Sequence, residues 1–163
     1  GGVGMTDSPC SDFQAGAESM FQFINVARAG INFLPGMGHL GSFMGGSLAK
    51  LVLDAELVDY SKRFMKPLEF TEDSMATDLI EKVGPGGNFI AEPHTLKHCR
   101  SEYTVPSVFV RENYDTWTKK DYPTAMQLAA DKAEKLLEQY EQPEIDPEIK
   151  KDLEHYMKKN YEL

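Results

Sequence analysis

A chain of 163 residues, 41% of them apolar, is long enough to bury a hydrophobic core, and its length fits a single domain. Its net charge of −9, with no basic cluster, argues against nucleic-acid binding. No apolar run approaches the ~18 residues of a membrane span, and two cysteines without a CxxC pair favour a reducing, cytoplasmic compartment.

The first thirty residues predict the end of a strand, a turn and a helix. Residues 1–5 read GGVGM, like a strand end, and residues 6–9 contain the Asp-Ser-Pro pattern of a turn. Ser11 or Asp12 can cap a helix over residues 12–29, whose apolar residues recur every three or four positions. Gly30 stands where such a helix ends.

The stretch from Gly30 to Leu53 is the one around which the rest of the chain is organised. It begins with an apolar run, Ile31–Leu34, which predicts a buried strand. A loop follows that holds His39 among five glycines, and a second helix is expected from about Ser42 to Met65, before Pro67. In parallel α/β proteins, ligands bind in loops at the carboxyl ends of strands.

The remainder of the chain predicts short elements and then two terminal helices. Thr71 caps a further helix, which ends at residues 84–88, and residues 89–90 predict a short strand or an extended segment. Residues 93–98 form a helical turn. Residues 101–121 look irregular, with five buried anchors at Val105, Val108, Phe109, Tyr114 and Trp117. Pro123 and the pair Asp146–Pro147 each begin a terminal helix.

Several residues are candidates for chemistry, and each has a plainer alternative. His39, in the glycine loop, can exchange a proton or orient a ligand, or bond only the backbone. Asp7 holds the equivalent place one unit earlier and can attract a cation or close an Asx turn. His94 and His98 share a helical face, but without a third ligand in the sequence pattern we expect no metal site. Residues 84–87 can cradle an anion or simply stop a helix.

Three motifs together carry a resemblance to a known family. They read TDSPCSDFQAGAE, NFLPGMGHLGS followed by SLAKLVLDAELV, and DLIEKVGPGGNF followed by HTLKH. In these motifs the chain resembles the trimethylamine methyltransferase family, the corrinoid-dependent, pyrrolysine-type methylamine methyltransferases. The resemblance implies that Asp7 and His39 are catalytic and that Gly86, Gly87, Phe89 and His94 help to bind the substrate.

The same resemblance implies an α/β fold, the C-terminal part of a (β/α)8 TIM barrel. Residues 1–121 would supply its last βα units, and residues 122–163 would form terminal helices packed on the barrel. We expect the chain to be the downstream piece of such a gene and, as an isolated fragment, to be mostly helical. Exposed strand edges and helix faces predict a homo-oligomer.

The function implied is transfer of a methyl group from trimethylamine to the cobalt of a corrinoid protein. No cofactor is then bound directly, because the corrinoid is carried by this partner protein. Many trimethylamine enzymes of the family are encoded with an amber codon read as pyrrolysine. One alternative is a relative that lacks pyrrolysine and acts on a quaternary amine such as glycine betaine. Another is a helical interaction module without catalysis.

Overall fold

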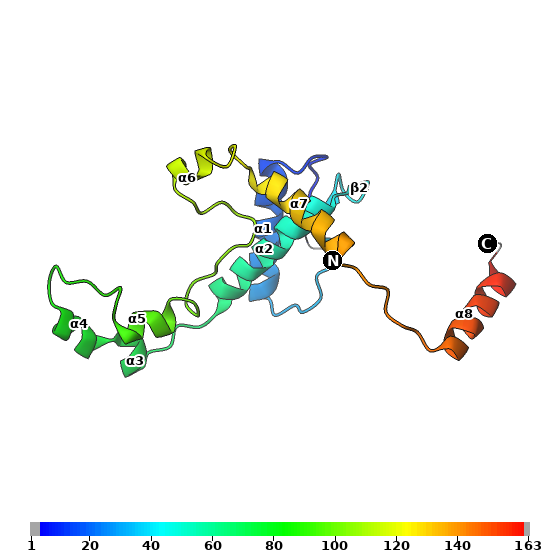
Figure 1. The fold of residues 1–163 in the computed structure, drawn as a ribbon. Coiled ribbons are helices and arrows are strands. Elements are labelled where there is room, and N and C mark those ends of the chain that lie inside the picture. Colours follow the sequence, from blue (N-terminus) through cyan, green and yellow to red (C-terminus); the bar gives the residue numbers. More distant parts are fainter. Residues whose placement is uncertain (1–3, 162–163) are drawn as a thin grey trace.

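The computed structural model describes residues 4–161, and over that range the chain is mostly helical, as predicted. Its elements, in chain order, are α1 (Phe13–Arg28), β1 (His39–Leu40), β2 (Gly45–Gly46), α2 (Leu48–Met65), α3 (Glu72–Met75), α4 (Thr77–Val83), α5 (Pro93–His98), α6 (Tyr114–Thr118), α7 (Ala125–Glu138) and α8 (Pro147–Asn160). Figure 1 shows α1, α2 and α7 together in a central body. The arm of α3, α4 and α5 extends to one side of this body and α8 to the other.

The central body is held by α2, which packs against both α1 and α7. Five apolar side chains are buried among the described residues: Ala15 and Phe23 on α1, Val108 in the loop before α6, and Ala129 and Ala133 on α7. The small alanines let α7 approach α2 closely. Such a core is very small for a chain of this length.

All four fully buried side chains of helix α2 are polar, and its apolar side chains are half-buried or exposed. Its buried residues are Lys50, Asp54, Glu56 and Ser61, whereas Leu48 and Phe64 are exposed. Glu56 is held by Ser107, whose backbone N–H donates to its Oε1 at 2.8 Å. The buried face of α2 therefore depends on hydrogen bonds and an ion pair rather than on apolar contact.

The first helix matches its prediction closely. Asp12 is the N-cap of α1 and accepts a hydrogen bond from the Ala15 N–H at 3.0 Å. At the other end Gly30 adopts a φ of +70°, the left-handed conformation in which helices commonly end. The sequence signals at both ends of α1 are thus confirmed.

The predicted start of the second helix is wrong. α2 begins at Leu48 with Ser47 as its N-cap, although it ends at Met65 as predicted. Residues 41–44 instead form the turn of a two-stranded antiparallel hairpin, in which His39 pairs with Gly46 and Leu40 with Gly45. Ser42 and Phe43 have φ values of +52° and +74°, which exclude a right-handed helix there.

The predicted strands are not found within residues 4–161. Residues 31–34 are irregular and Phe33 is 79% exposed, because no second strand lies beside them in the described part of the chain. Residues 89–90 are not in a strand either, and the Asn88 side chain accepts a hydrogen bond from the Ile90 N–H at 2.8 Å. Of the strand end expected at residues 1–5, positions 1–3 lie outside the described residues and positions 4–5 are not in a strand. The barrel itself remains a prediction.

The later elements follow the predicted order with local differences. Thr71 caps α3 through a capping box, but Ala76, with a φ of +48°, separates α3 from α4. Among the five anchors expected in residues 101–121, Val108 is buried, whereas Val105 and Tyr114 are exposed.

The two terminal helices form close to where they were expected. α7 begins at Ala125, two residues after Pro123, since Thr124 provides its cap. α8 begins at Pro147, with Asp146 as its cap, and no residue of α8 is buried. None of the helices described is both long and apolar enough to cross a membrane.

Candidate functional site

Two loops that are far apart in sequence meet beside the hairpin. The Gly41 N–H donates to the Ser8 carbonyl at 2.8 Å, and the Ser42 N–H donates to the Thr6 carbonyl at 3.0 Å. The Ser42 hydroxyl also donates to the carboxylate of Asp7. The structure therefore places the turn of Asp7 beside the hairpin that contains His39, so the two residues expected to be catalytic lie on adjoining segments.

His39 lies in β1 with its ring against Phe43. The two rings meet edge to face, with their centroids 4.6 Å apart. The Nδ1 atom of His39 is buried and has no hydrogen-bond partner among the described residues. Buried polar atoms are nearly always paired, so an orphaned ring nitrogen is a candidate for contact with a ligand.

The turn next to His39 is strained. Gly41, Ser42 and Phe43 all have positive φ, a conformation that costs non-glycine residues about 1–3 kcal/mol each. Strain of this kind concentrates at functional sites. Sequence reasoning missed Ser42 and Phe43; an aromatic residue inside a glycine-rich loop was the available signal.

A cavity of about 220 Å³ opens beside this turn. It is lined by Met5, Thr6, Asp7, Glu18, Gln22, Ser42 and Phe43. His39 reaches it only through its contact with Phe43. Two carboxylates and an aromatic ring suit a small organic cation, because both groups attract positive charge.

Glu18 fixes the turn that contains Asp7. It accepts a hydrogen bond from the Thr6 hydroxyl at 2.6 Å and from the Asp7 N–H at 2.9 Å. The Thr6 bond is the main reason why the pKa of Glu18 lies below its ordinary value, with further help from Gln14 and the Asp7 N–H. Glu18 therefore carries its negative charge at neutral pH.

A buried ion pair holds the glycine loop against α1 and α2. Lys50 Nζ lies 2.5 Å from Asp54 Oδ2, and both side chains are about 2–3% exposed. Asp54 also accepts from the Gly38 N–H at 2.8 Å, and Lys50 donates to the Gly4 carbonyl and the Ser19 hydroxyl, each at 3.1 Å. Burial raises the pKa of Asp54, while the Gly38 N–H and Lys50 act in the opposite direction. The pair fixes the backbone immediately before His39.

The residues expected to bind substrate in the GPGG segment lie elsewhere. Gly86, Gly87 and Phe89 lie between α4 and α5, and His94 lies on α5, on the arm rather than at the hairpin (Figure 1). At Gly87 an added Cβ would come within 2.4 Å of the Val83 carbonyl oxygen, so the helix stop itself requires glycine. The structure does not bring these four residues into the cavity of Asp7.

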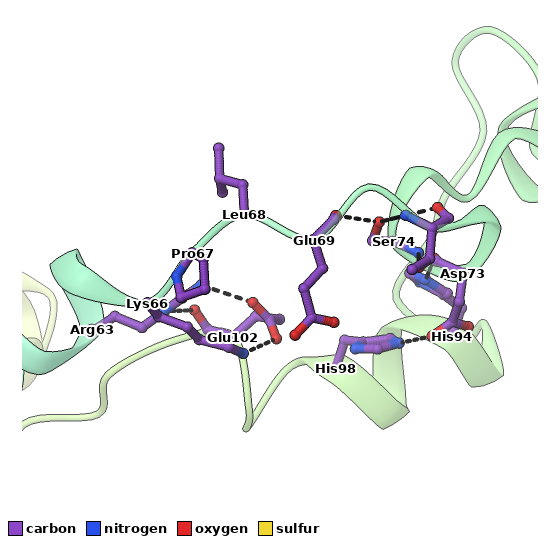
Figure 2. Close-up of a pocket in the computed structure, with 11 residues that line it drawn as sticks. Arg63, Lys66, Pro67, Leu68, Glu69, Asp73, Ser74, His94, His98 and Glu102 are labelled. Carbon is purple, nitrogen blue, oxygen red and sulfur yellow. Dashed lines mark hydrogen bonds and ion pairs between the residues drawn. The ribbon is translucent and has the colours of Figure 1, made fainter.

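A separate cavity of about 290 Å³ lies between the end of α2 and helices α3 and α5 (Figure 2). On one side Glu102 accepts hydrogen bonds from Arg63 and Lys66, each at 2.8 Å. The Lys66 hydrogen bond is the main reason why the pKa of Glu102 is lowered. His94, His98 and Asp73 lie on the other side.

Comparison with known proteins identifies close relatives. The sequence model described as trimethylamine methyltransferase (MTTB) matches residues 1–162. The chain is 40% identical over 157 residues to the glycine betaine methyltransferase of Desulfitobacterium hafniense strain Y51, covering 96% of this chain and 33% of that protein. It is 33% identical over 147 residues to the trimethylamine methyltransferase MttB of D. hafniense strain DCB-2, and this match covers 89% of the chain and 29% of that protein. It is 29% identical over 152 residues to the trimethylamine methyltransferase MttB2 of Methanosarcina mazei, and this match covers 91% of the chain and 30% of that protein. The chain thus spans about a third of the length of these relatives.

Proposed function

Since the chain belongs to the trimethylamine methyltransferase family, we propose that it contributes to an enzyme that transfers a methyl group from a small methylated amine to the cobalt of a corrinoid protein. The family match over residues 1–162 is the observation that carries the proposal. The relatives described above are methyltransferases for trimethylamine and for glycine betaine. The second alternative, a helical module without catalysis, gains no support from them.

The cavity beside Asp7 supplies a physical basis for holding a methylated ammonium ion. In methyl transfer the C–N bond breaks and its electron pair stays on nitrogen, so a cationic nitrogen that leaves as a neutral amine is the better donor. Asp7 and Glu18 attract such a cation, and the Phe43 ring adds a cation–π contact. His39 does not line the cavity itself, but its ring packs edge to face against Phe43 and so positions the Phe43 ring.

Exposed apolar side chains support the proposal that the chain is one part of a larger barrel. Phe13 is 92% exposed, Met44 90% and Phe33 79%. Soluble monomers rarely leave so many large apolar side chains in water. In a complete (β/α)8 barrel the neighbouring units would cover them, and Asp7 and His39 would lie on loops at its carboxyl end.

Trimethylamine is the first candidate substrate, by the family resemblance. A tertiary amine is a poor donor unless an electrophile holds it as a charged adduct. The resemblance assigns that task to pyrrolysine, which is not among the 163 residues. A quaternary amine such as glycine betaine already carries its charge and needs no adduct. The 40% identity to the glycine betaine enzyme, against 33% to the trimethylamine enzyme of D. hafniense strain DCB-2, favours this second candidate.

A chimera tests the proposal. Residues 1–163 replace the matching third of the D. hafniense glycine betaine methyltransferase, and a second chimera uses the MttB protein of strain DCB-2. Each is incubated with a corrinoid protein and either amine, and NMR follows the demethylated product. We expect the first chimera to demethylate glycine betaine, and His39→Ala to slow it about 10²-fold.

His155→Ala is the matched control, because His155 lies on α8 far from the cavity in the chain. It should leave the rate unchanged. A folded chimera that demethylates neither amine would overturn the proposed function. An unchanged rate in His39→Ala would remove His39 from the site but leave the function standing.

A further inference from the structure

A cluster of metal-binding side chains lies on the arm, outside the proposed methyl-transfer site. His94 and His98 are four residues apart on α5, and their ring centroids lie 4.5 Å apart. Asp73 on α3 faces both rings (Figure 2). One ligand atom from each of the three residues lies within 4.8 Å of the other two.

The distances are close to those that a bound ion requires. His98 Nε2 lies 2.9 Å from Asp73 Oδ2. His94 Nε2 instead contacts the Asp73 backbone oxygen, at 2.6 Å, and would have to release this contact to bind an ion with the carboxylate. Around a tetrahedral zinc ion, with metal–ligand bonds of about 2.0–2.1 Å, neighbouring donor atoms stand about 3.3 Å apart. A small widening of the cluster would therefore admit an ion.

The third ligand was not visible in the sequence pattern. Two histidines alone gave no reason to expect a metal, and Asp73 precedes His94 by 21 residues. The fold brings it to them because α3 and α5 lie against each other on the arm. Two imidazoles and one carboxylate are a donor set that divalent transition metals of the zinc class accept.

The arm has little else to hold it together. No residue in the range 66–104 is buried. Its helices α3, α4 and α5 contain four, seven and six residues, which is too short to be stable alone. Segments without an apolar core commonly depend on a metal for their fold.

A competing cation already contacts the cluster. Lys97 Nζ lies 2.8 Å from Asp73 Oδ2, the same oxygen that His98 approaches. Glu69 lines the same cavity (Figure 2) but is not part of the cluster formed by Asp73, His94 and His98.

We propose that Asp73, His94 and His98 bind one divalent ion of the zinc class and that this ion fastens α3 to α5. The fourth position is filled by water. The role is structural, since it ties together two short helices and closes the loop between them. It is independent of the methyl-transfer function proposed above.

Zinc titration of the full 163-residue chain, by calorimetry, tests the site directly. We expect one ion per chain, and at least about a tenfold loss of affinity in each of His94→Gln, His98→Gln and Asp73→Asn. The chain has four histidines in all, so His39→Gln and His155→Gln are matched controls that should bind zinc normally. Lys97→Gln removes the competing cation and should tighten binding.

Two further readouts separate the site from chance binding by a histidine pair. Cobalt(II) should give the absorption of a tetrahedral site, and zinc should slow hydrogen exchange of amides in residues 72–98. The proposal is overturned if no ion binds, if Asp73→Asn binds as tightly as the parent chain, or if His155→Gln abolishes binding. It is also overturned if the bound ion leaves exchange in the arm unchanged. Circular dichroism of each variant confirms that the helices persist.

Discussion

Removing the charge of Asp54 should destabilise the chain strongly at neutral pH. Asp54→Asn keeps an oxygen that can accept from the Gly38 N–H, but it leaves Lys50 buried without its counter-ion. Breaking a buried ion pair by removing one partner costs about 3–5 kcal/mol. We expect the lower end, about 3 kcal/mol, because Lys50 keeps the Gly4 carbonyl and the Ser19 hydroxyl. That is a large share of the ~5–15 kcal/mol that stabilises a typical domain.

A double-mutant cycle measures the coupling between the two residues. Lys50→Met alone leaves a buried carboxylate, whereas the variant with both Lys50→Met and Asp54→Asn leaves no buried charge. The double variant should lose less unfolding free energy than Lys50→Met and Asp54→Asn lose together, and the difference should be about 2 kcal/mol or more. Urea unfolding followed by far-UV circular dichroism at pH 7 gives all three values.

The loss of unfolding free energy caused by Asp54→Asn should also depend on pH. Burial raises the pKa of Asp54, so its neutral form becomes populated in the native state as the pH falls. Because the folded pKa is the higher one, protonating Asp54 favours the native state, so the parent chain should gain stability relative to Asp54→Asn as the pH falls through the folded pKa. If Asp54→Asn costs less than about 1 kcal/mol at pH 7, or if the two single losses add within about 0.5 kcal/mol, the ion pair does not hold the loop as argued.

Three other outcomes are expected. The 163-residue chain alone should show no methyl transfer from trimethylamine to a corrinoid protein, which NMR detection of demethylated amine by the purified chain would contradict. Light scattering should find a dimer or larger species at micromolar concentration, because Phe13 and Phe33 are exposed. A monodisperse monomer would count against the proposal that neighbouring units of a barrel normally cover these side chains. Glu18 has a folded pKa below its ordinary 4.5, so its stabilising effect is present above that pH and is lost as the pH falls through the folded pKa. Glu18→Gln should therefore reduce the loss of stability in acid, and identical pH profiles would show that the Thr6 contact contributes nothing.

Local signals in the sequence predicted the starts of three helices correctly, although the predicted start of α2 was wrong. Asp12, Thr71 and Asp146 cap helices where expected, since a capping side chain acts on backbone groups only two or three residues away. Strands could not be predicted in the same way. Residues 31–34 have a strand-like composition, but a strand needs a neighbour, and none lies beside them in the described part of the chain.

The candidate site was predictable only in part. The position of His39 in a glycine loop and of Asp7 in a turn located two loops that the structure does bring together. The strained Phe43 was missed, because a positive φ cannot be read from an aromatic residue. Asp73 was missed as a partner of His94, because their contact depends on how two short helices fold together.

The extended segment before α8 limits how far that helix can lie from α7. Eight residues, 139–146, separate α7 from α8, and fully extended they reach about 26–29 Å. Within that radius the linker keeps α8 at an effective concentration of about millimolar. The apolar stripe of Ile149, Leu153 and Tyr156 is exposed and ready for contact. A groove with only millimolar affinity for this stripe would be occupied by α8 about half of the time. Because the linker raises the local concentration of α8, such a contact needs less affinity than one between separate molecules.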